Sequence, residues 1–483
     1  PEFHLRVQPQ LLVVPGRHLP APQVSYAQKT TSVVNARWDL RDKKLLKGAT
    51  MTSWRCLYVT AGQQVWSTPA DLQTCLSSFL TGLRGIGIQC TAAPQPELLR
   101  VDASNPSAAV SRKLQDLARG KPSILLIIIP GYNNTAIYNA VKYTCDVQEG
   151  VLCQCVVDNK FAKQQIQYYV NVGLKMNLKL GGVNHSIPTS SFGTISPEKT
   201  MFVGLDVTHP SPGSTSSAPS VASIVSSIDR TLGQWPAAIR VQEARKEMIT
   251  DLTELFQGQL RLWQSKSRSL PANLILYRDG VSEGQYQVVL GDELPSIKKA
   301  ISNVYPPAEV RQGVPRLSII IVGKRHHTRF YPTKEEYADK TGNLKNGLVV
   351  DRGVTSFCNW DFFLQAHSAL HGTARPAHYY VVYDEVLRKL NPGQGPASAA
   401  DALEKMTHGM CYLFGRATSA VSICPPAYYA DLVCERARCY LSEHFAPTGG
   451  ATAASESSSN TGMPAASAQV ALHDAIKDKM FYI

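Results

Sequence analysis

Three aspartates stand in sequence settings that suggest a site for hard metal ions. Asp206 and Asp279 each end an apolar stretch typical of a buried strand, and Asp431 lies in the segment Pro425–Cys434. An aspartate at the end of a buried strand is costly unless it is paired or holds a cation. Carboxylate oxygens suit Mg²⁺, and two such ions held among acids promote cleavage of phosphodiesters. Each aspartate alone has an ordinary explanation as a turn, cap or solvated helix residue, so this chemistry requires a fold that brings the three together.

The composition indicates a multidomain protein with a polyanionic partner. At 483 residues the chain is too long for one hydrophobic core. Its 49 Lys and Arg residues exceed its 37 Asp and Glu residues, for a formal net charge of +12. Such a surplus favours RNA or DNA first and an anionic membrane second, while a basic surface without a partner is the alternative.

The cysteines and the longest apolar run favour a cytoplasmic protein with no membrane segment. The eleven cysteines are scattered without CxxC pairs, which is typical of reduced thiols. The closest spacing, Cys153-Gln-Cys155, would place two thiols on one face of a strand. The longest apolar run, Ile124–Ile129, is too short to span a bilayer.

The pattern along the chain predicts two α/β units after an irregular segment. Residues 1–50 are Pro-rich and are expected to form a linker draped over the rest. In residues 51–182 the run Ile124–Ile129 suits a strand buried on both faces of a parallel sheet. Residues 183–483 alternate apolar strand patterns with helical ones, including a helix expected at 241–264.

One further segment has a different composition. Residues 447–467 are rich in Ala, Ser, Thr and Gly, and they are expected to form a disordered insertion at the surface.

Four segments of the second unit together resemble a known family. They look like the PIWI domain of a eukaryotic Argonaute, and they occur in the order of that family. The segments are Gly204–Pro210, Tyr277–Gln285, Val322–Arg329 and Pro426–Val433. The resemblance implies the MID-PIWI lobe, with a Rossmann-like MID domain at 51–182 and an RNase H-like PIWI domain at 183–483. A fungal member of a quelling-type silencing pathway is the expected source.

The resemblance also implies a complete set of catalytic acids. The segment Arg245–Leu252 matches the family motif that contains a glutamate, which nominates Glu247; otherwise Glu247 would be an exposed carboxylate on a helix. The fourth position is commonly His in animal members, but here it is Asp431, which should preserve Mg²⁺ binding. His378 lies outside the matched motif and is expected to be structural. The implied catalytic residues are Asp206, Glu247, Asp279 and Asp431, with Asp206, Asp279 and Asp431 as ligands of Mg²⁺, for which Mn²⁺ can substitute.

Polar residues at helical spacing predict a site for a terminal phosphate. Tyr138 and Lys142 are four residues apart in a helical pattern, as are Lys175 and Lys179, so each pair shares a face. Without a family these would be ordinary surface or core-edge residues. Their surroundings resemble the family's MID pocket, although the loop Pro130–Thr135 differs from the animal version and leaves the preferred first base open. The similarity assigns the guide 5′ phosphate to Tyr138, Lys142, Gln154, Lys175, Lys179 and Arg436.

A basic cluster after the strand expected at 317–322 suits a phosphate backbone. An exposed strand end is the alternative explanation. The family resemblance extends guide-backbone contacts to further residues downstream. The complete set is Lys324, Arg325, His327, Arg329, His367, Arg375, Arg416 and Tyr428.

The resemblance therefore implies an RNA-guided, Mg²⁺-dependent endoribonuclease. Its expected partners are an siRNA-like guide, a target RNA and silencing-pathway proteins, with no membrane. One alternative is an Argonaute that represses without cutting, although no catalytic acid is missing. Another is a different RNase H-like nuclease such as an integrase, which would have no reason to carry the phosphate-site pairs.

Overall fold

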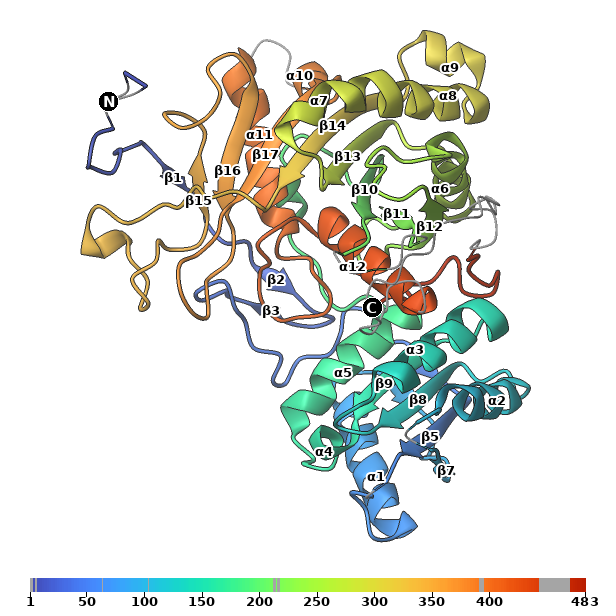
Figure 1. Cartoon of the computed structure of the whole chain (residues 1–483). Helices are drawn as coiled ribbons and strands as arrows, with labels where there is room; N and C mark the ends of the chain where they lie inside the picture. The colour runs from blue at the N-terminus through green and yellow to red at the C-terminus, as the bar shows by residue number, and fades with distance from the viewer. Residues whose placement is uncertain are drawn as a thin grey trace.

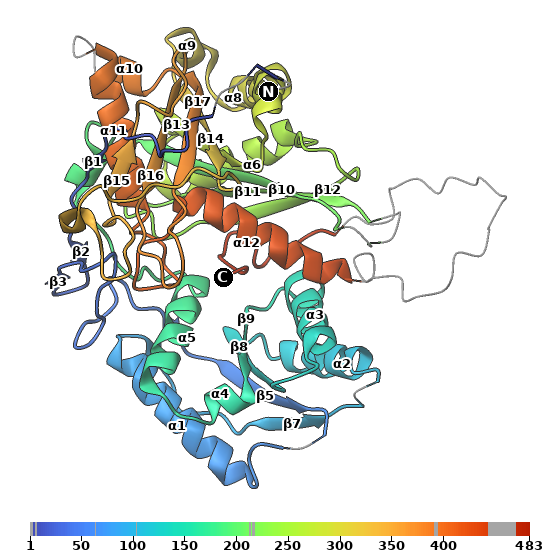
Figure 2. The ribbon, with the colours of Figure 1, turned by 60° about the vertical axis from the view of Figure 1, so that its left-hand side comes forward.

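The computed structural model describes most of the chain and contains two α/β units on separate sheets (Figure 1). It describes residues 3–4, 7–62, 64–102, 104–211, 214, 218–390, 395–442 and 470–483, without the side chains of 395–398. The insertion expected at 447–467 lies outside the described residues. Helix α12 (Pro425–Tyr440) lies between the larger sheet and helix α3 (Thr135–Tyr143) of the smaller unit (Figure 2).

The smaller unit has a parallel sheet with the strand order β7–β5–β8–β9. Alternate residues of β8 belong to two different core clusters, one shared with α1 and α5 and the other with α2 and α3. Helices therefore cover both faces, which explains the continuous apolar run in β8. The elements are β5 (Trp54–Thr60), α1 (Pro69–Gly85), β7 (Glu97–Arg100), α2 (Ser107–Ala118), β8 (Ile124–Ile129), β9 (Cys153–Val157) and α5 (Ile166–Lys179).

The larger unit has a nine-stranded sheet in which β10, β13 and β14 run parallel. One face packs against α6 and α8, and the other packs against α11 and α12. In spatial order the strands are β1 (Arg17–His18), β15 (Leu348–Val350), β16 (Trp360–Gln365), β17 (Ala377–Asp384), β14 (Arg316–Gly323), β13 (Asn273–Asp279), β10 (Thr200–Thr208), β11 (Ser220–Ser226) and β12 (Ala237–Gln242). The helices are α6 (Leu252–Ser267), α8 (Leu294–Val304) and α11 (Gly395–Met410).

Short elements complete the described structure. The two-residue strands are β2 (Val24–Ser25), β3 (Thr30–Thr31), β4 (Thr50–Met51) and β6 (Gln89–Cys90), and the short helices are α4 (Asp158–Phe161), α7 (Tyr286–Val288), α9 (Pro307–Arg311) and α10 (Leu387–Leu390). Single π-helical turns cover Thr144–Glu149 and Val289–Glu293, and 3₁₀ turns cover Thr189–Phe192, Glu283–Gln285 and Glu335–Tyr337.

The segment before residue 50 forms regular backbone pairings that its composition does not predict. Its strand β1 pairs with β15 at the edge of the larger sheet. Isolated bridges join Lys47 to Val183 and Arg37 to Ser419. Backbone pairing therefore fastens this segment to the larger unit, in addition to its side-chain packing.

The helix expected at 241–264 is wrong at its start. Strand β12 continues to Gln242 because it pairs with β11, and α6 begins at Leu252. Between them Arg245 has a φ of 62°, a left-handed conformation that does not continue a helix. Glu247 therefore lies in a loop and not on an exposed helix face.

The expectation of an α/β protein with a parallel MID-like sheet followed by an RNase H-like unit is confirmed by this architecture. No helix in the described part of the chain is both long and apolar enough to cross a membrane.

Candidate nucleic-acid interface and acid cluster

The larger sheet brings together Asp206 and Asp279, which lie near the carboxyl ends of two parallel strands. Strands β10 and β13 are parallel and in register up to the residues that precede Asp206 and Asp279. Helix α12 lies close against this end of the sheet, since a Cβ added at Gly204 would overlap the carbonyl oxygen of Pro426. The same helix carries Asp431. The fold thus brings the three predicted aspartates to one region.

Lys324 connects two of these acids. Its Nζ lies 2.8 Å from Asp279 Oδ2 and 3.2 Å from Asp431 Oδ1. The Asp279 side chain is buried, whereas those of Lys324 and Asp431 remain 29% and 31% exposed. The ammonium group predicted to contact a guide backbone is therefore engaged by the acids in this structure.

Asp206 is a carboxyl group crowded by other acids. Burial raises the pKa of Asp206 to about 7, and the negative charges of Asp279 and Asp431 add to this effect. The pKa of Asp279 is also raised, mainly by burial. A group of acids with this much uncompensated charge favours a bound cation, because the cation stabilises the ionised carboxylates.

Glu247 reaches the three aspartates from the loop between β12 and α6. Arg278 Nη1 donates to Glu247 Oε1 at 2.9 Å, and His209 Nε2 lies 2.7 Å from Oε2. A Cβ added at Gly280 would lie 3.2 Å from Asp206 Oδ1 and 3.3 Å from Glu247 Oε1. The carboxylates of Asp206 and Glu247 therefore both lie beside Gly280. Glu247 thus joins the three aspartates at the carboxyl ends of β10 and β13.

The acids fit a hard divalent ion by their chemistry. They offer carboxylate oxygens, the donors that Mg²⁺ and Mn²⁺ take, and their charge is only partly balanced by Lys324. Within the described residues no three His, Cys, Asp or Glu side chains already stand in a metal-holding arrangement. The ammonium group of Lys324 takes the position between two of the acids.

This arrangement predicts that Lys324 competes with a divalent ion. Lys324→Met should bind Mn²⁺ more tightly than the parent when guide is absent, because a positive charge leaves the acids. Electron paramagnetic resonance of Mn²⁺ titrated into the protein measures the affinity directly. Lys334→Met, which removes an exposed lysine paired with Glu336, is the matched control. Equal or weaker Mn²⁺ binding by Lys324→Met would contradict the competition.

His378 has the contacts of a structural residue, as expected. Its Nε2 lies 2.7 Å from Asp361 Oδ2, and its ring stacks on Phe363 at 4.4 Å. These contacts fix the ring between β16 and β17.

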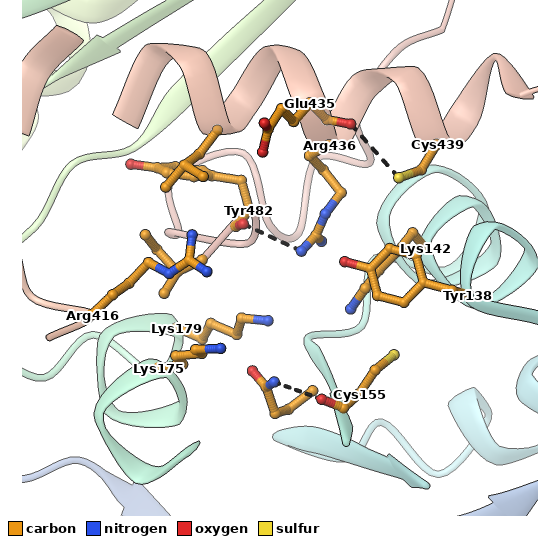
Figure 3. A pocket seen from close by; sticks show the side chains of 13 residues that line it. Tyr138, Lys142, Cys155, Lys175, Lys179, Arg416, Glu435, Arg436, Cys439 and Tyr482 are labelled. Atoms are coloured by element: carbon orange, nitrogen blue, oxygen red, sulfur yellow. Dashed lines mark hydrogen bonds between the residues drawn. The ribbon is translucent and has the colours of Figure 1, made fainter. Parts of the chain in front are cut away.

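A cavity of about 340 Å³ between the two units gathers the residues predicted to bind the guide 5′ phosphate. Figure 3 shows side chains from α3, α5 and α12 converging on it. All six predicted residues line it, namely Tyr138, Lys142, Gln154, Lys175, Lys179 and Arg436.

Two of its lysines are buried, and neither forms an ion pair with an acid among the described residues. Lys142 and Lys179 are each 1% exposed. Lys142 Nζ lies 5.2 Å from the centre of the Tyr138 ring and 3.1 Å from Cys153 Sγ. Lys179 Nζ donates to the Cys153 carbonyl oxygen at 2.6 Å. Burying ammonium groups in this way is costly, and an anion in the cavity would offset the cost.

The cations of the cavity also repel one another. Burial lowers the pKa of Lys175 to about 8, and the positive charges of Arg416 and Lys142 add to this effect. Burial, followed by the charge of Lys142, lowers the pKa of Lys179. A ligand with close to two negative charges, such as a terminal phosphate, matches this concentration of cations.

Arg436 ties the cavity wall to both units. Its Nη1 donates to Asp146 Oδ2 at 2.8 Å and to the Phe481 carbonyl oxygen at 3.1 Å. Nη2 donates to the Tyr482 carbonyl oxygen at 3.2 Å, and the Tyr440 hydroxyl also donates to Asp146. The guanidinium is thus held in a fixed orientation at the cavity.

A groove of about 840 Å³ leads from this cavity toward the acids. Lys175 and Arg416 line both the cavity and the groove. The groove is also lined by Asp431 and by Tyr428, whose ring stacks on Phe414 at 4.5 Å. Arg416 and Tyr428 therefore line the same groove as Asp431.

The other predicted backbone residues do not form one uniform surface. Arg325 and Arg375 line a second cavity of about 310 Å³ beside Lys324, and His327 is exposed. Arg329 donates to the carbonyl oxygens of its own loop. Burial lowers the pKa of His367 to about 4, so its imidazole is neutral near pH 7 and offers no positive charge to a phosphate.

Sequence reasoning missed the residues that position Glu247. Arg278 is fully buried and pairs with both Glu247 and Glu293. His209 holds the other oxygen of Glu247. Both residues lie inside the segments that carry the family resemblance: Arg278 directly precedes Asp279, and His209 follows Asp206. An arginine next to an acid at the end of an apolar strand pattern was the available signal.

Comparison with known proteins shows the family to which the chain belongs. Residues 124–442 match the Piwi domain family. Argonaute 5 of Arabidopsis thaliana is 34% identical over 508 residues, covering 100% of this chain and 48% of that protein. The crystal structure of the C-terminal lobe of a budding yeast Argonaute matches with a TM-score of 0.82 at 29% identity, covering 97% of this chain and 95% of that one.

Two further solved structures are similar. Kluyveromyces polysporus Argonaute with a guide RNA has a TM-score of 0.82 at 28% identity, covering 98% of this chain and 57% of that one. The N. crassa QDE-2 AGO MID-PIWI domains have a TM-score of 0.65 at 30% identity, covering 91% of this chain and 100% of that one.

The fold, the acids and these matches define a Piwi-domain protein, and the chain belongs to the Argonaute family. It spans about half the length of the curated relatives it matches.

Proposed function

We propose that this chain anchors the 5′-monophosphate end of a small guide RNA and cleaves a target RNA paired with that guide. The observation that carries the proposal is the groove of about 840 Å³, which shares Lys175 and Arg416 with the cationic cavity and reaches Asp431. A strand held by its phosphate would run along this groove toward the acids. The similarity to an Argonaute solved with a guide RNA supports guide binding by this chain.

In this proposal the cavity recognises charge and not base identity. Lys142, Lys175 and Lys179 supply ammonium groups, and Arg436 offers a guanidinium already oriented by Asp146. Charge-assisted hydrogen bonds from these groups to a phosphate are stronger than those to a hydroxyl. Target choice would then rest on base pairing with the guide.

The acids would carry the hydrolysis. Asp206, Asp279 and Asp431 would hold Mg²⁺ or Mn²⁺, and bound ions would supply charge to the scissile phosphate and lower the pKa of water. Glu247 is positioned beside them by Arg278 and His209. Glu247 would thus supply the fourth carboxylate of the catalytic set.

The second cavity yields a test of sequence-independent binding. Arg325→Gln with Arg375→Gln should weaken guides of every sequence equally and reduce the slope of log affinity against log salt by roughly 2, because each arginine is expected to neutralise about one phosphate. Filter binding of three unrelated guides at several salt concentrations measures both effects. A weakening that depends on guide sequence would instead indicate that these arginines touch bases.

The pKa of Lys175 yields a pH test of the phosphate site. A phosphate binds the protonated lysine, so affinity for 5′-phosphorylated RNA should fall as pH rises above about 8, by up to about tenfold per pH unit. The affinity for a 5′-hydroxyl RNA should change much less over the same pH range. In Lys175→Met the fall in affinity for the 5′-phosphorylated RNA should disappear. Binding titrations between pH 7 and 9.5 in EDTA measure this dependence of affinity on pH. An unchanged fall in affinity in Lys175→Met would rule out Lys175 as its source.

A guide-binding lobe that represses without cutting is the second candidate. The cavity and groove would serve it equally well, and Lys324 between Asp279 and Asp431 is the feature that favours it. Cleavage by the full-length protein in Mn²⁺ separates the two functions, because a repressor would bind guide and target and leave the target intact.

A further inference from the structure

Lys324 takes part in two features of the larger unit that binding and cleavage would use separately. Its ammonium group lies 2.8 Å from Asp279 Oδ2 and 3.2 Å from Asp431 Oδ1. The same side chain also lines the second cavity of about 310 Å³, together with Arg325 and Arg375. One flexible cation therefore belongs both to the acid cluster and to a cationic cavity.

The second cavity suits an anion. It lies where the residues that follow β14 meet the start of β17 and the segment before α12. The described residues that line it include three cations, Lys324, Arg325 and Arg375, and no acid. In the part of the chain that the structure describes, neither arginine forms an ion pair with an acid. A phosphate of a bound strand would therefore find two guanidinium groups that acids have not already engaged.

The side chain of Lys324 is suited to exchange one anionic partner for another. It is 29% exposed and Asp431 is 31% exposed, so packing does not lock the contact between them. A lysine carries its charge on a flexible four-carbon stem, and the ammonium group can move while the backbone stays in place. A phosphate held by Arg325 and Arg375 would offer Lys324 a second anion inside a cavity that its side chain already lines.

We propose that Lys324 couples guide loading to metal binding at the acids. Before loading, its ammonium group occupies the carboxylates of Asp279 and Asp431 and weakens the binding of a divalent ion. A guide phosphate in the second cavity draws the ammonium group away, and the released carboxylates then accept Mg²⁺ or Mn²⁺. This inference rests on the proposed function and adds a regulation to it: the acids become a strong metal site only when a guide is bound.

Coupling of this kind acts in both directions. If a guide raises the affinity for Mn²⁺ by some factor, Mn²⁺ must raise the affinity for the guide by the same factor. Guide phosphates also attract Mn²⁺ without help from Lys324, because their negative charge adds to that of the acids. Lys324 accounts only for the part of the coupling that disappears when this lysine is replaced.

The effect of a guide on the affinity for Mn²⁺ tests this coupling. Full-length protein is titrated with Mn²⁺, with and without a saturating 5′-phosphorylated guide, and electron paramagnetic resonance reports the free ion. The same titration of free guide corrects for ions held by the RNA itself. The guide should raise the affinity of the parent for Mn²⁺ by roughly tenfold or more, within the usual range of coupling between two sites.

Three variants identify the source of this gain in affinity. Lys324→Met should bind Mn²⁺ tightly without a guide, and the guide should raise its affinity much less. Lys334→Met, which removes an exposed lysine paired with Glu336, should show the parental gain. Arg325→Gln with Arg375→Gln, at a saturating guide concentration, should show a smaller gain than the parent, because no phosphate is held beside Lys324.

The outcomes separate this inference from the proposed function. Equal gains in the parent and in Lys324→Met would overturn the inference, because the guide would then act on the metal by its own charge alone. A parent that binds the guide without any gain in Mn²⁺ affinity would overturn it as well, and so would a full parental gain in the double arginine variant. A parent that does not bind the 5′-phosphorylated guide would instead overturn the proposed function.

Discussion

Asp431→Asn in the full-length protein should bind guide and target normally and cut at about 1% of the parental rate or less in Mg²⁺. The change nearly keeps the shape of the side chain but removes a charge that pairs with Lys324 and faces the groove. Loss of one metal ligand costs several kcal/mol of transition-state stabilisation, and about 2.7 kcal/mol corresponds to 100-fold in rate. Single-turnover cleavage of a labelled target, beside a binding titration, measures the two effects separately.

Asp116→Asn is the matched control, because it removes an exposed helix carboxylate of the smaller unit. It should cut at the parental rate. Parental cutting by Asp431→Asn would mean that another group completes the acid set. Loss of guide binding by Asp431→Asn would mean that this residue is structural.

Lys142→Met with Lys179→Met should weaken a 5′-phosphorylated short RNA by roughly 100-fold or more and a 5′-hydroxyl RNA far less. Each lysine is expected to make a charge-assisted hydrogen bond to the phosphate, worth about 1.5–3 kcal/mol. Methionine keeps most of the buried aliphatic stem, so the smaller unit should fold. Competition titrations of the two RNAs at fixed salt measure the ratio.

Lys160→Met with Lys163→Met removes two exposed lysines of the same unit and should leave that ratio unchanged. An equal loss for both RNAs in the Lys142 and Lys179 variant would show that the cavity does not read the phosphate.

Residues that end a buried strand pattern were the easiest to predict. Asp279 ends β13 and Asp206 lies near the end of β10, two strands that the apolar runs made evident. The continuous apolar run of β8 indicated a sheet covered on both faces. Helical spacing also paired Lys175 with Lys179 correctly on α5. These are local signals, and local signals survive in the fold when tertiary packing does not oppose them.

Contacts between distant segments were not predictable from pattern. The ion pairs of Lys324 depend on β13 and β14 lying side by side and on α12 crossing the sheet. The segment around Glu247 was expected to be helical, but it forms a loop between β12 and α6 in which Glu247 pairs with the buried Arg278.

The most direct test of the central claim is to map where a target is cut when the guide is shifted. If the cavity anchors the 5′ phosphate and the acids cut at the far end of one groove, the distance between them is fixed. Full-length protein loaded with 5′-phosphorylated guides that begin one nucleotide apart should cut a single target at sites that move by one nucleotide with the guide 5′ end. Cut sites that stay in place, or no cutting in either Mg²⁺ or Mn²⁺, would contradict the account.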